Sequence, residues 1–205
     1  MTAGTVVLVR HGVTDWNAQG RFQGQSDVPL NETGRAQAAA MARRLPERTR
    51  PTSIISSDLG RAVDTASALA DACGLEVTTD ARLREVNVGS WEGLTMADLA
   101  DQAPELDLDG LDGEFPDDFR WSPVGETGLE ATTRVVAAIR EHAEALDVDG
   151  VLAVVGHGAV LRNAVVRLMG VTAQLTVMSV MRNCGWAVLR PRATYWRLVA
   201  YNQTA

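Results

Sequence analysis

The sequence predicts an α/β fold, namely a three-layer α/β/α sandwich with a mostly parallel central sheet. Continuous apolar, largely β-branched runs at 6–9 and 151–155 are typical of strands buried on both faces of a parallel sheet. Segments with helical features separate the apolar runs, so strands and helices alternate along the chain. Each of these two strands also runs within two residues into a His-Gly pair.

Four elements are expected between the first strand and the middle of the chain: a helix at 33–45, a strand at 53–56, a helix at 59–72 and a strand at 76–79. Asn31 is positioned to cap the first helix, and Pro46 is expected to end it. Asp58 is the expected cap of the second helix, which Gly74 should terminate.

The second half is expected to contain a short helix from Thr95, a helix at 126–146, a helix at 159–168 and final strands at 186–189 and 196–199. The first of these begins with a spacing like that of a capping box, with Asp98 in place of the usual Glu or Gln. Residues 101–125 are rich in Asp, Gly and Pro and carry scattered aromatics, which predicts a long irregular excursion. We therefore expect one domain, 1–205, with a lid-like insertion at about 95–125.

Composition restricts the partners of the protein. Its 205 residues are 46% hydrophobic and 22% charged, and 19 basic against 26 acidic residues give a net charge of −7. This acidic balance argues against binding to nucleic acid or an anionic membrane, which requires clustered Lys and Arg. Two widely spaced cysteines, Cys73 and Cys184, are expected to be reduced. The first residues lack a signal peptide pattern, so we expect a cytoplasmic protein.

Two of the three histidines occupy equivalent positions. His11 and His157 each follow a buried strand and precede a glycine. Ligands of open α/β sheets bind beyond the carboxyl ends of the strands, so both histidines should reach the functional face. His142 lies among charged residues on a predicted helix and is expected to be solvated surface.

A zinc site is the alternative use of paired histidines, but neither has a third ligand at a typical spacing. Their neighbours are cationic instead, because Arg10 precedes His11 and Arg61 follows another strand. Guanidinium groups repel metal ions and bind phosphate through paired hydrogen bonds. The pattern predicts an oxyanion site without a metal or a cofactor.

The ordered motifs resemble the histidine phosphatase superfamily, in its phosphoglycerate-mutase-like branch. The similar segments are Leu8-Val9-Arg10-His11-Gly12, Arg21-Phe22-Gln23-Gly24, Leu30 to Ala38, Ser56 to Ala62, Leu83 to Gly93 and Gly156-His157-Gly158. Two positions depart from the pattern: Asp64 stands where many relatives carry Gln, and Asn87 where the residue is often aromatic or apolar.

The resemblance implies a double displacement in which His11 is the nucleophile and Glu85 the general acid and base. Arg10, Arg61 and His157 would surround the phosphoryl group, with His157 protonated when the anion is bound. Binding roles are also expected for Asn17, Gln23, Gly24, Gly158 and the first backbone N–H groups of the helix after Gly158.

Hydrolysis of a small-molecule phosphate monoester is the main functional prediction, with a sugar phosphate or a glycosylated phosphoglycerate among the expected substrates. A phosphoglycerate mutase is the alternative, because it would use the same core residues. A non-catalytic binding protein on the same fold is a third hypothesis. The sequence leaves open whether the protein forms a homodimer.

Overall fold

The structure, a computed structural model, describes residues 4–103, 118–171 and 178–205. A six-stranded sheet of order β3-β2-β4-β1-β5-β6 lies at its centre. The strands are β1 (Thr5–Arg10), β2 (Ser53–Ser56), β3 (Val77–Thr79), β4 (Val151–Gly156), β5 (Trp186–Pro191) and β6 (Trp196–Gln203). The first four in space are mutually parallel, whereas β5 and β6 are antiparallel to their neighbours. The predicted mostly parallel sheet is confirmed.

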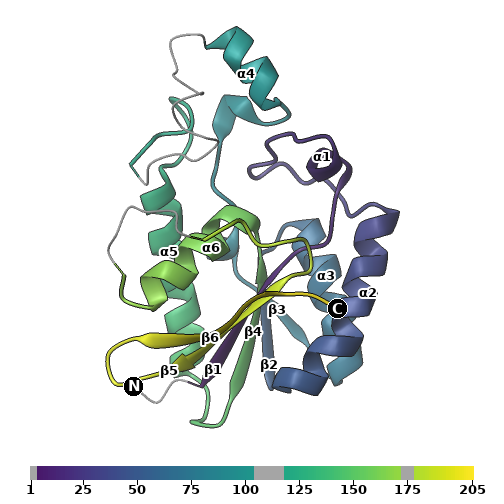
Figure 1. Cartoon of the computed structure of the whole chain (residues 1–205), viewed down its shortest axis with the longest axis vertical. Helices are drawn as coiled ribbons and strands as arrows, with labels where there is room; N and C mark the ends of the chain where they lie inside the picture. The colour runs from purple at the N-terminus through teal and green to yellow at the C-terminus, as the bar shows by residue number, and fades with distance from the viewer. Residues whose placement is uncertain (1–3, 104–117, 172–177) are drawn as a thin grey trace.

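Helices cover both faces of this sheet (Figure 1). Their bounds are α1 (Asp15–Ala18), α2 (Glu32–Thr49), α3 (Gly60–Cys73), α4 (Met96–Gln102), α5 (Gly128–Glu144) and α6 (Gly158–Leu168), and two 3-10 turns span Ala81–Leu83 and Gly89–Trp91. The pair α2 and α3 packs on one face, and the pair α5 and α6 packs on the other. The three predicted layers are therefore present.

The alternation of β1 explains why both faces are covered. Val6 and Leu8 belong to the core beneath α5 and α6, whereas Val7 and Val9 belong to the core beneath α2 and α3. All four side chains are fully buried. Each such side chain contributes about 1.5–3 kcal/mol through removal of apolar surface from water. This burial fixes the strand that carries His11.

Pro46 does not end helix α2, contrary to the prediction. Helix α2 continues to Thr49 with Pro46 in its last turn, and Arg50 ends it in the left-handed conformation. A proline removes one backbone donor but leaves its carbonyl available, and the Pro46 carbonyl accepts from Arg50 N at 3.1 Å. Burial of Leu45 on the sheet holds the helix together at this point.

Asp58 does not cap α3, which is a second correction. The N-cap residue is Leu59, which has no side-chain capping bond. The Asp58 carboxylate instead pairs with Arg84 at 2.6–2.7 Å, while Asp27 accepts from the Gly60 amide at 2.8 Å. Asp27, which is distant in sequence, thus supplies the capping bond that was predicted for the adjacent Asp58.

His142 is not simply solvated surface. Its Nε2 lies 3.1 Å from Asp80 Oδ2, and Asp80 is also bound by Arg82. The Arg82 hydrogen bond lowers the pKa of Asp80 to about 2 against the opposing effect of burial. His142 therefore helps attach α5 to the segment that leads to Glu85.

The predicted insertion is described only in part. The expected capping box is present at α4, where Thr95 and Asp98 each accept from the other's backbone N–H. Residues 104–117, including Asp107, Asp109, Asp112 and Asp117, lie outside the described residues. The chain returns through Phe119 and Trp121, which pack against Trp91 at ring-centroid distances of 5.7 and 5.9 Å. Figure 1 shows α4 beyond the upper end of the sheet.

The described part of the chain contains no helix that is both long and apolar enough to cross a membrane.

Candidate active site

The two histidines meet because their strands are neighbours in register. Arg10 at the end of β1 lies opposite Gly156 at the end of β4. The residues that follow, His11 and His157, therefore project from adjacent strand ends, with ring centroids 5.2 Å apart. Both are buried, with 2% and 0% of their surface exposed.

The two ring nitrogens of His11 differ, because only Nδ1 has a hydrogen-bond partner among the described residues. Nδ1 lies 2.6 Å from the carbonyl oxygen of Gly12, so Nδ1 carries the proton and Nε2 keeps its lone pair. Burial lowers the pKa of His11 well below its usual value, and the charges of Arg10 and Arg61 lower it further. The imidazole is thus neutral and nucleophilic.

Glycine at position 12 is needed for close backbone packing. A Cβ at Gly12 would stand 2.5 Å from the carbonyl oxygen of Gly34, in the first turn of α2. The Gly12 amide donates to Thr65 Oγ1 at 3.0 Å. These contacts hold the backbone at His11 against the start of α2 and the buried face of α3.

Arg10 and Arg61 bring two guanidinium groups to the site, of which Arg61 is fully buried and Arg10 partly buried. Arg10 donates to the carbonyl of Met181 at 2.6 Å, and Arg61 donates to the carbonyls of Ser26 and Gly24 at 2.6 and 2.9 Å. The Nε atom of each is buried without a hydrogen-bond partner among the described residues. Burial lowers the pKa of both. Two partly satisfied cations in one place create a strong demand for an anion.

His157 is fully buried beside His11. Its Nε2 lies 2.9 Å from Ser57 Oγ, and its Nδ1 has no partner within the described ranges. Burial lowers the pKa of His157 well below its usual value, with further lowering from Arg61, His11 and Arg10. In the absence of an anion this histidine is therefore neutral, and the expected protonation would require the charge of a bound ligand.

Glu85 lies in an irregular segment and is held by backbone amides. Its carboxylate accepts from the N–H groups of Val86, Ala159 and Val160, each at 3.1 Å. The amides of Ala159 and Val160 begin α6 and were expected to bind the phosphoryl anion directly. They bind the Glu85 carboxylate instead, because a carboxylate is well suited to a helix N-terminus.

The other predicted binding residues surround the same place. Asn17 Oδ1 accepts from the Thr14 amide at 3.1 Å and from Asn183 Nδ2 at 3.2 Å. Gln23 is 8% exposed, and its Oε1 accepts from Thr14 Oγ1 at 2.9 Å. Gly24 supplies one of the carbonyls that hold Arg61.

Gly158 lies close to the Arg10 side chain. A Cβ at this position would stand 3.1 Å from Arg10 Nε and 3.0 Å from Val180 Cγ1. A side chain at this position would therefore require Arg10 or Val180 to shift.

A cavity of about 350 Å³ opens over these groups. Its inner wall includes Arg10, His11, Arg61 and Glu85, while His157 is buried beside His11. The outer wall mixes apolar and cationic side chains: Phe22, Met96, Trp121, Arg21 and Arg162. The space is large enough for a phosphate ester with a sizeable alcohol part.

Sequence reasoning missed several residues that support the site. Ser57 binds His157, and Asn183 Nδ2 donates to the His11 carbonyl at 3.0 Å. Arg134 donates to backbone carbonyls around Glu85. Ser57 stood inside a quoted motif, but Asn183 and Arg134 have no sequence pattern that signals their contacts.

Of the two departures from the family pattern, Asp64 is exposed on α3. Asn87 lies two residues after Glu85, and its backbone pairs with Glu126. Within the described residues, no group of three or more His, Cys, Asp and Glu side chains is placed to hold a metal ion.

Comparison with known proteins identifies the family. The sequence profile of the histidine phosphatase superfamily (branch 1) matches residues 6–204. A glucosyl-3-phosphoglycerate phosphatase of Mycobacterium tuberculosis is 37% identical over 224 residues, covering 100% of this chain and 97% of the relative. A Yersinia pestis protein named "Probable phosphoglycerate mutase GpmB" is 38% identical over 191 residues, covering 93% of this chain and 86% of that protein.

The solved structures agree with this assignment. A mycobacterial glucosyl-3-phosphoglycerate phosphatase in complex with VO3 superposes with a TM-score of 0.87 at 34% identity, covering 98% of this chain and 100% of that one. The predicted fold and the predicted phosphatase class are confirmed. The chain belongs to the histidine phosphatase superfamily, branch 1.

Proposed function

We propose that this phosphoric monoester hydrolase acts on a small-molecule ester through a phosphohistidine at His11. The single observation that carries the proposal is a set of buried nitrogens around that residue that have no hydrogen-bond partner in the part of the chain that the structure describes. They are Nε of Arg10, Nε of Arg61 and Nδ1 of His157. Such atoms are costly unless a ligand supplies acceptors, and a phosphoryl group has three oxygens to offer.

In the first step, the Nε2 lone pair of His11 forms a bond to phosphorus while the ester P–O bond breaks. The electron pair of that bond goes to the alcohol oxygen, which takes a proton from Glu85. The Gly12 carbonyl supports the attack by His11, because it fixes the proton on Nδ1 and stabilises the cationic ring that forms. Arg10 and Arg61 offset the charge on the transferring oxygens.

In the second step, a water molecule attacks the phosphohistidine and gives a proton to the Glu85 carboxylate. The N–P bond breaks, His11 regains its lone pair, and inorganic phosphate leaves. Acid and base assistance of this kind is typically worth about 10²–10⁴-fold in rate. His157 donates from Nδ1 to a phosphoryl oxygen, and the dianion favours its protonated form.

We propose glucosyl-3-phosphoglycerate as the first substrate to test. This choice rests on the similarity to a curated relative and to a solved structure that are both named glucosyl-3-phosphoglycerate phosphatase and that match over nearly their full length. It rests also on the apolar and cationic side chains of the outer cavity wall. Trp121 and Phe22 offer apolar faces to a sugar ring, and Arg21 offers charge to a carboxylate. Other sugar phosphates and nucleoside-like phosphates belong in the same panel, ranked by kcat/KM.

A phosphoglycerate mutase is the second candidate, and the similarity to GpmB favours it. The two activities are separated by a coupled assay. Release of free phosphate without added bisphosphoglycerate is the result expected of a hydrolase. Interconversion of phosphoglycerates without release of phosphate would reverse the assignment.

The intermediate is tested by rapid quench with a substrate labelled on phosphorus. We expect an acid-labile, base-stable phosphoenzyme that is lost in His11→Ala together with turnover. A label that survives acid and is lost in base would indicate an acyl phosphate and contradict the role of His11.

The proposal includes a cytoplasmic, metal-independent enzyme that does not bind nucleic acid. The net charge of −7 and the two free cysteines support it. We expect unchanged turnover in excess EDTA, and a loss reversed by added metal would contradict this part. The lid-like role of 95–125 remains a prediction. Light scattering tests for the homodimer, which the sequence leaves open.

A further inference from the structure

The segment that carries Glu85 has no regular secondary structure of its own. Residues 84–88 lie between two 3-10 turns and are neither helix nor strand. The backbone groups of such a segment need partners from elsewhere, because unpaired buried amides and carbonyls are costly. What supplies those partners determines where the Glu85 carboxylate stands.

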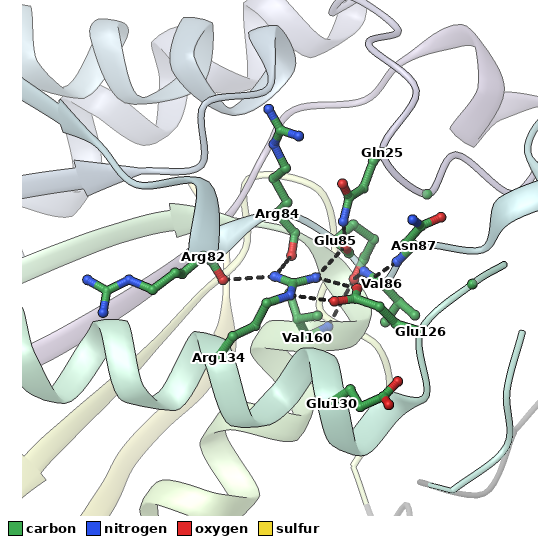
Figure 2. A network of polar contacts seen from close by, with 12 residues as sticks. Gln25, Arg82, Arg84, Glu85, Val86, Asn87, Glu126, Glu130, Arg134 and Val160 are labelled. Carbon is green, nitrogen blue, oxygen red and sulfur yellow. Dashed lines mark hydrogen bonds and ion pairs between the residues drawn. The ribbon is translucent and has the colours of Figure 1, made fainter.

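One arginine from α5 binds three carbonyls at and just before Glu85. Arg134 Nη1 donates to the carbonyls of Arg82 and Arg84 at 2.8 and 2.6 Å, and Nη2 donates to the carbonyl of Glu85 at 2.8 Å. Figure 2 shows the guanidinium surrounded by these three carbonyls. Gln25 Nε2 donates to the same Glu85 carbonyl at 3.1 Å.

The orientation of Arg134 is fixed in turn by Glu126. Nε and Nη2 of Arg134 bind the two carboxylate oxygens of Glu126 at 2.8 and 2.6 Å, which is a bidentate pair. Glu126 Oε2 also accepts from the Asn87 amide at 2.9 Å, while the Asn87 carbonyl accepts from Glu126 N at 2.8 Å. The Arg134–Glu126 pair therefore binds the backbone on both sides of Glu85, at Arg84 and at Asn87 (Figure 2).

The surroundings make this pair unlike an exposed surface bridge. The side chains of Arg134 and Glu126 are only 20% and 24% exposed. Burial would raise the pKa of Glu126, but the hydrogen bonds from Arg134 and the Asn87 amide outweigh it and lower that pKa. The carboxylate stays charged and the arginine stays oriented.

We propose that Arg134 and Glu126 are positioning residues for the general acid Glu85. Neither lines the cavity as described. They act by holding the backbone at Glu85 so that its carboxyl group reaches both the amides of α6 and the oxygen of the leaving alcohol. The proposal rests on the acid role of Glu85 stated above.

The test compares two leaving groups in Arg134→Met. A displacement of the acid of about 1 Å costs on the order of 10²-fold in rate, and we expect that loss in kcat with glycerol phosphate. The loss with para-nitrophenyl phosphate should be much smaller, because nitrophenolate leaves without a proton. Combining Arg134→Met with Glu85→Gln should cost nothing beyond Glu85→Gln alone.

Other variants guard against a merely structural explanation. Arg140→Met removes a guanidinium from the same helix, where it lies 5.8 Å from the Trp196 ring, and should show no leaving-group effect. Arg134→Lys should recover part of the loss, since an ammonium can donate to carbonyls but cannot form the bidentate pair. If Arg134→Met does not fold, Glu126→Gln tests the same prediction with a smaller change.

The outcomes separate this proposal from the one it rests on. If Glu85→Gln discriminates between the two leaving groups but neither Arg134→Met nor Glu126→Gln does, the positioning role is wrong and the acid role stands. Additive losses in the double variant would also overturn the positioning role. If Glu85→Gln lowers both rates equally, the acid assignment itself fails.

Discussion

At the scale of single residues, Gly158 limits the space available to the Arg10 guanidinium. Because a Cβ there would meet Arg10 Nε at 3.1 Å, Gly158→Ala should displace the guanidinium from its place. We expect weaker inhibition by inorganic phosphate or orthovanadate and a higher KM, with the fold retained. Loss of one charge-assisted contact typically costs about 1.5–3 kcal/mol, which corresponds to roughly tenfold or more in the inhibition constant.

Gly156 provides a matched control two residues earlier. A Cβ at Gly156 would meet only the Leu161 side chain, at an ordinary contact distance of 3.5 Å. Gly156→Ala should therefore leave inhibition by phosphate unchanged. Equal effects of the two substitutions would mean that general disturbance of the strand end, and not Arg10, explains the result.

The meeting of the two strand-end histidines was predictable from the sequence, whereas the residues that support the site were not. His11 and His157 follow strands whose burial is legible in the sequence, and parallel pairing then places them side by side. Arg134 looks like any charged residue on a helix surface. Its function depends on carbonyls some 50 residues away in sequence, which no local pattern encodes.

At the scale of secondary structure elements, Asn31 illustrates a cap that behaves as its sequence predicts. Its side chain accepts from the Gly34 amide at 2.9 Å at the start of α2. Asn31→Ala should destabilise the protein by about 1 kcal/mol, which for a chain of this size lowers Tm by about 2–4 °C. Thermal unfolding measures the shift.

Asn31→Ser is the control for that substitution, because serine retains a capping oxygen. It should recover most of the stability, although it loses the bond from Asn31 to Asp15. If serine is as destabilising as alanine, the contact with Asp15 matters more than the cap.

The predicted start of α3 and the predicted end of α2 were both wrong. The start of α3 is capped from Asp27 rather than Asp58, because Asp58 is engaged by Arg84. Helix α2 extends to Thr49, beyond Pro46, although its last buried residue is Leu45. At the start of α3, tertiary contacts thus override the local capping preference. At Pro46, the helix continues because the proline carbonyl still accepts a hydrogen bond in the last turn.

At the scale of the whole molecule, the two buried histidines make stability depend on pH. Burial lowers the pKa of both well below the ordinary value of 6.5. Unfolding exposes them, so below about pH 6.5 the unfolded chain binds more protons than the native protein. Stability should therefore be intact above pH 6.5 and fall as the pH decreases, by up to about 1.4 kcal/mol per pH unit for each histidine.

Urea denaturation between pH 8 and pH 5 measures this decline. Paired carboxylates such as Asp80, with a pKa of about 2, lose their contribution only at lower pH, so they do not confuse the comparison. Saturating phosphate should reduce the decline, because the anion favours protonated His157. A stability that stays flat from pH 8 to pH 5 would contradict the burial of neutral histidines.

The pairing of β1 also has a consequence for the order of folding. The two strands that flank β1 are β4 and β5, which begin at Val151 and Trp186. The strand that leads to His11 therefore pairs with segments that lie far from it in the sequence. Closing so long a loop is entropically expensive and slow. We therefore expect His11 and His157 to come together late in refolding, after β1 has paired with β4 and β5.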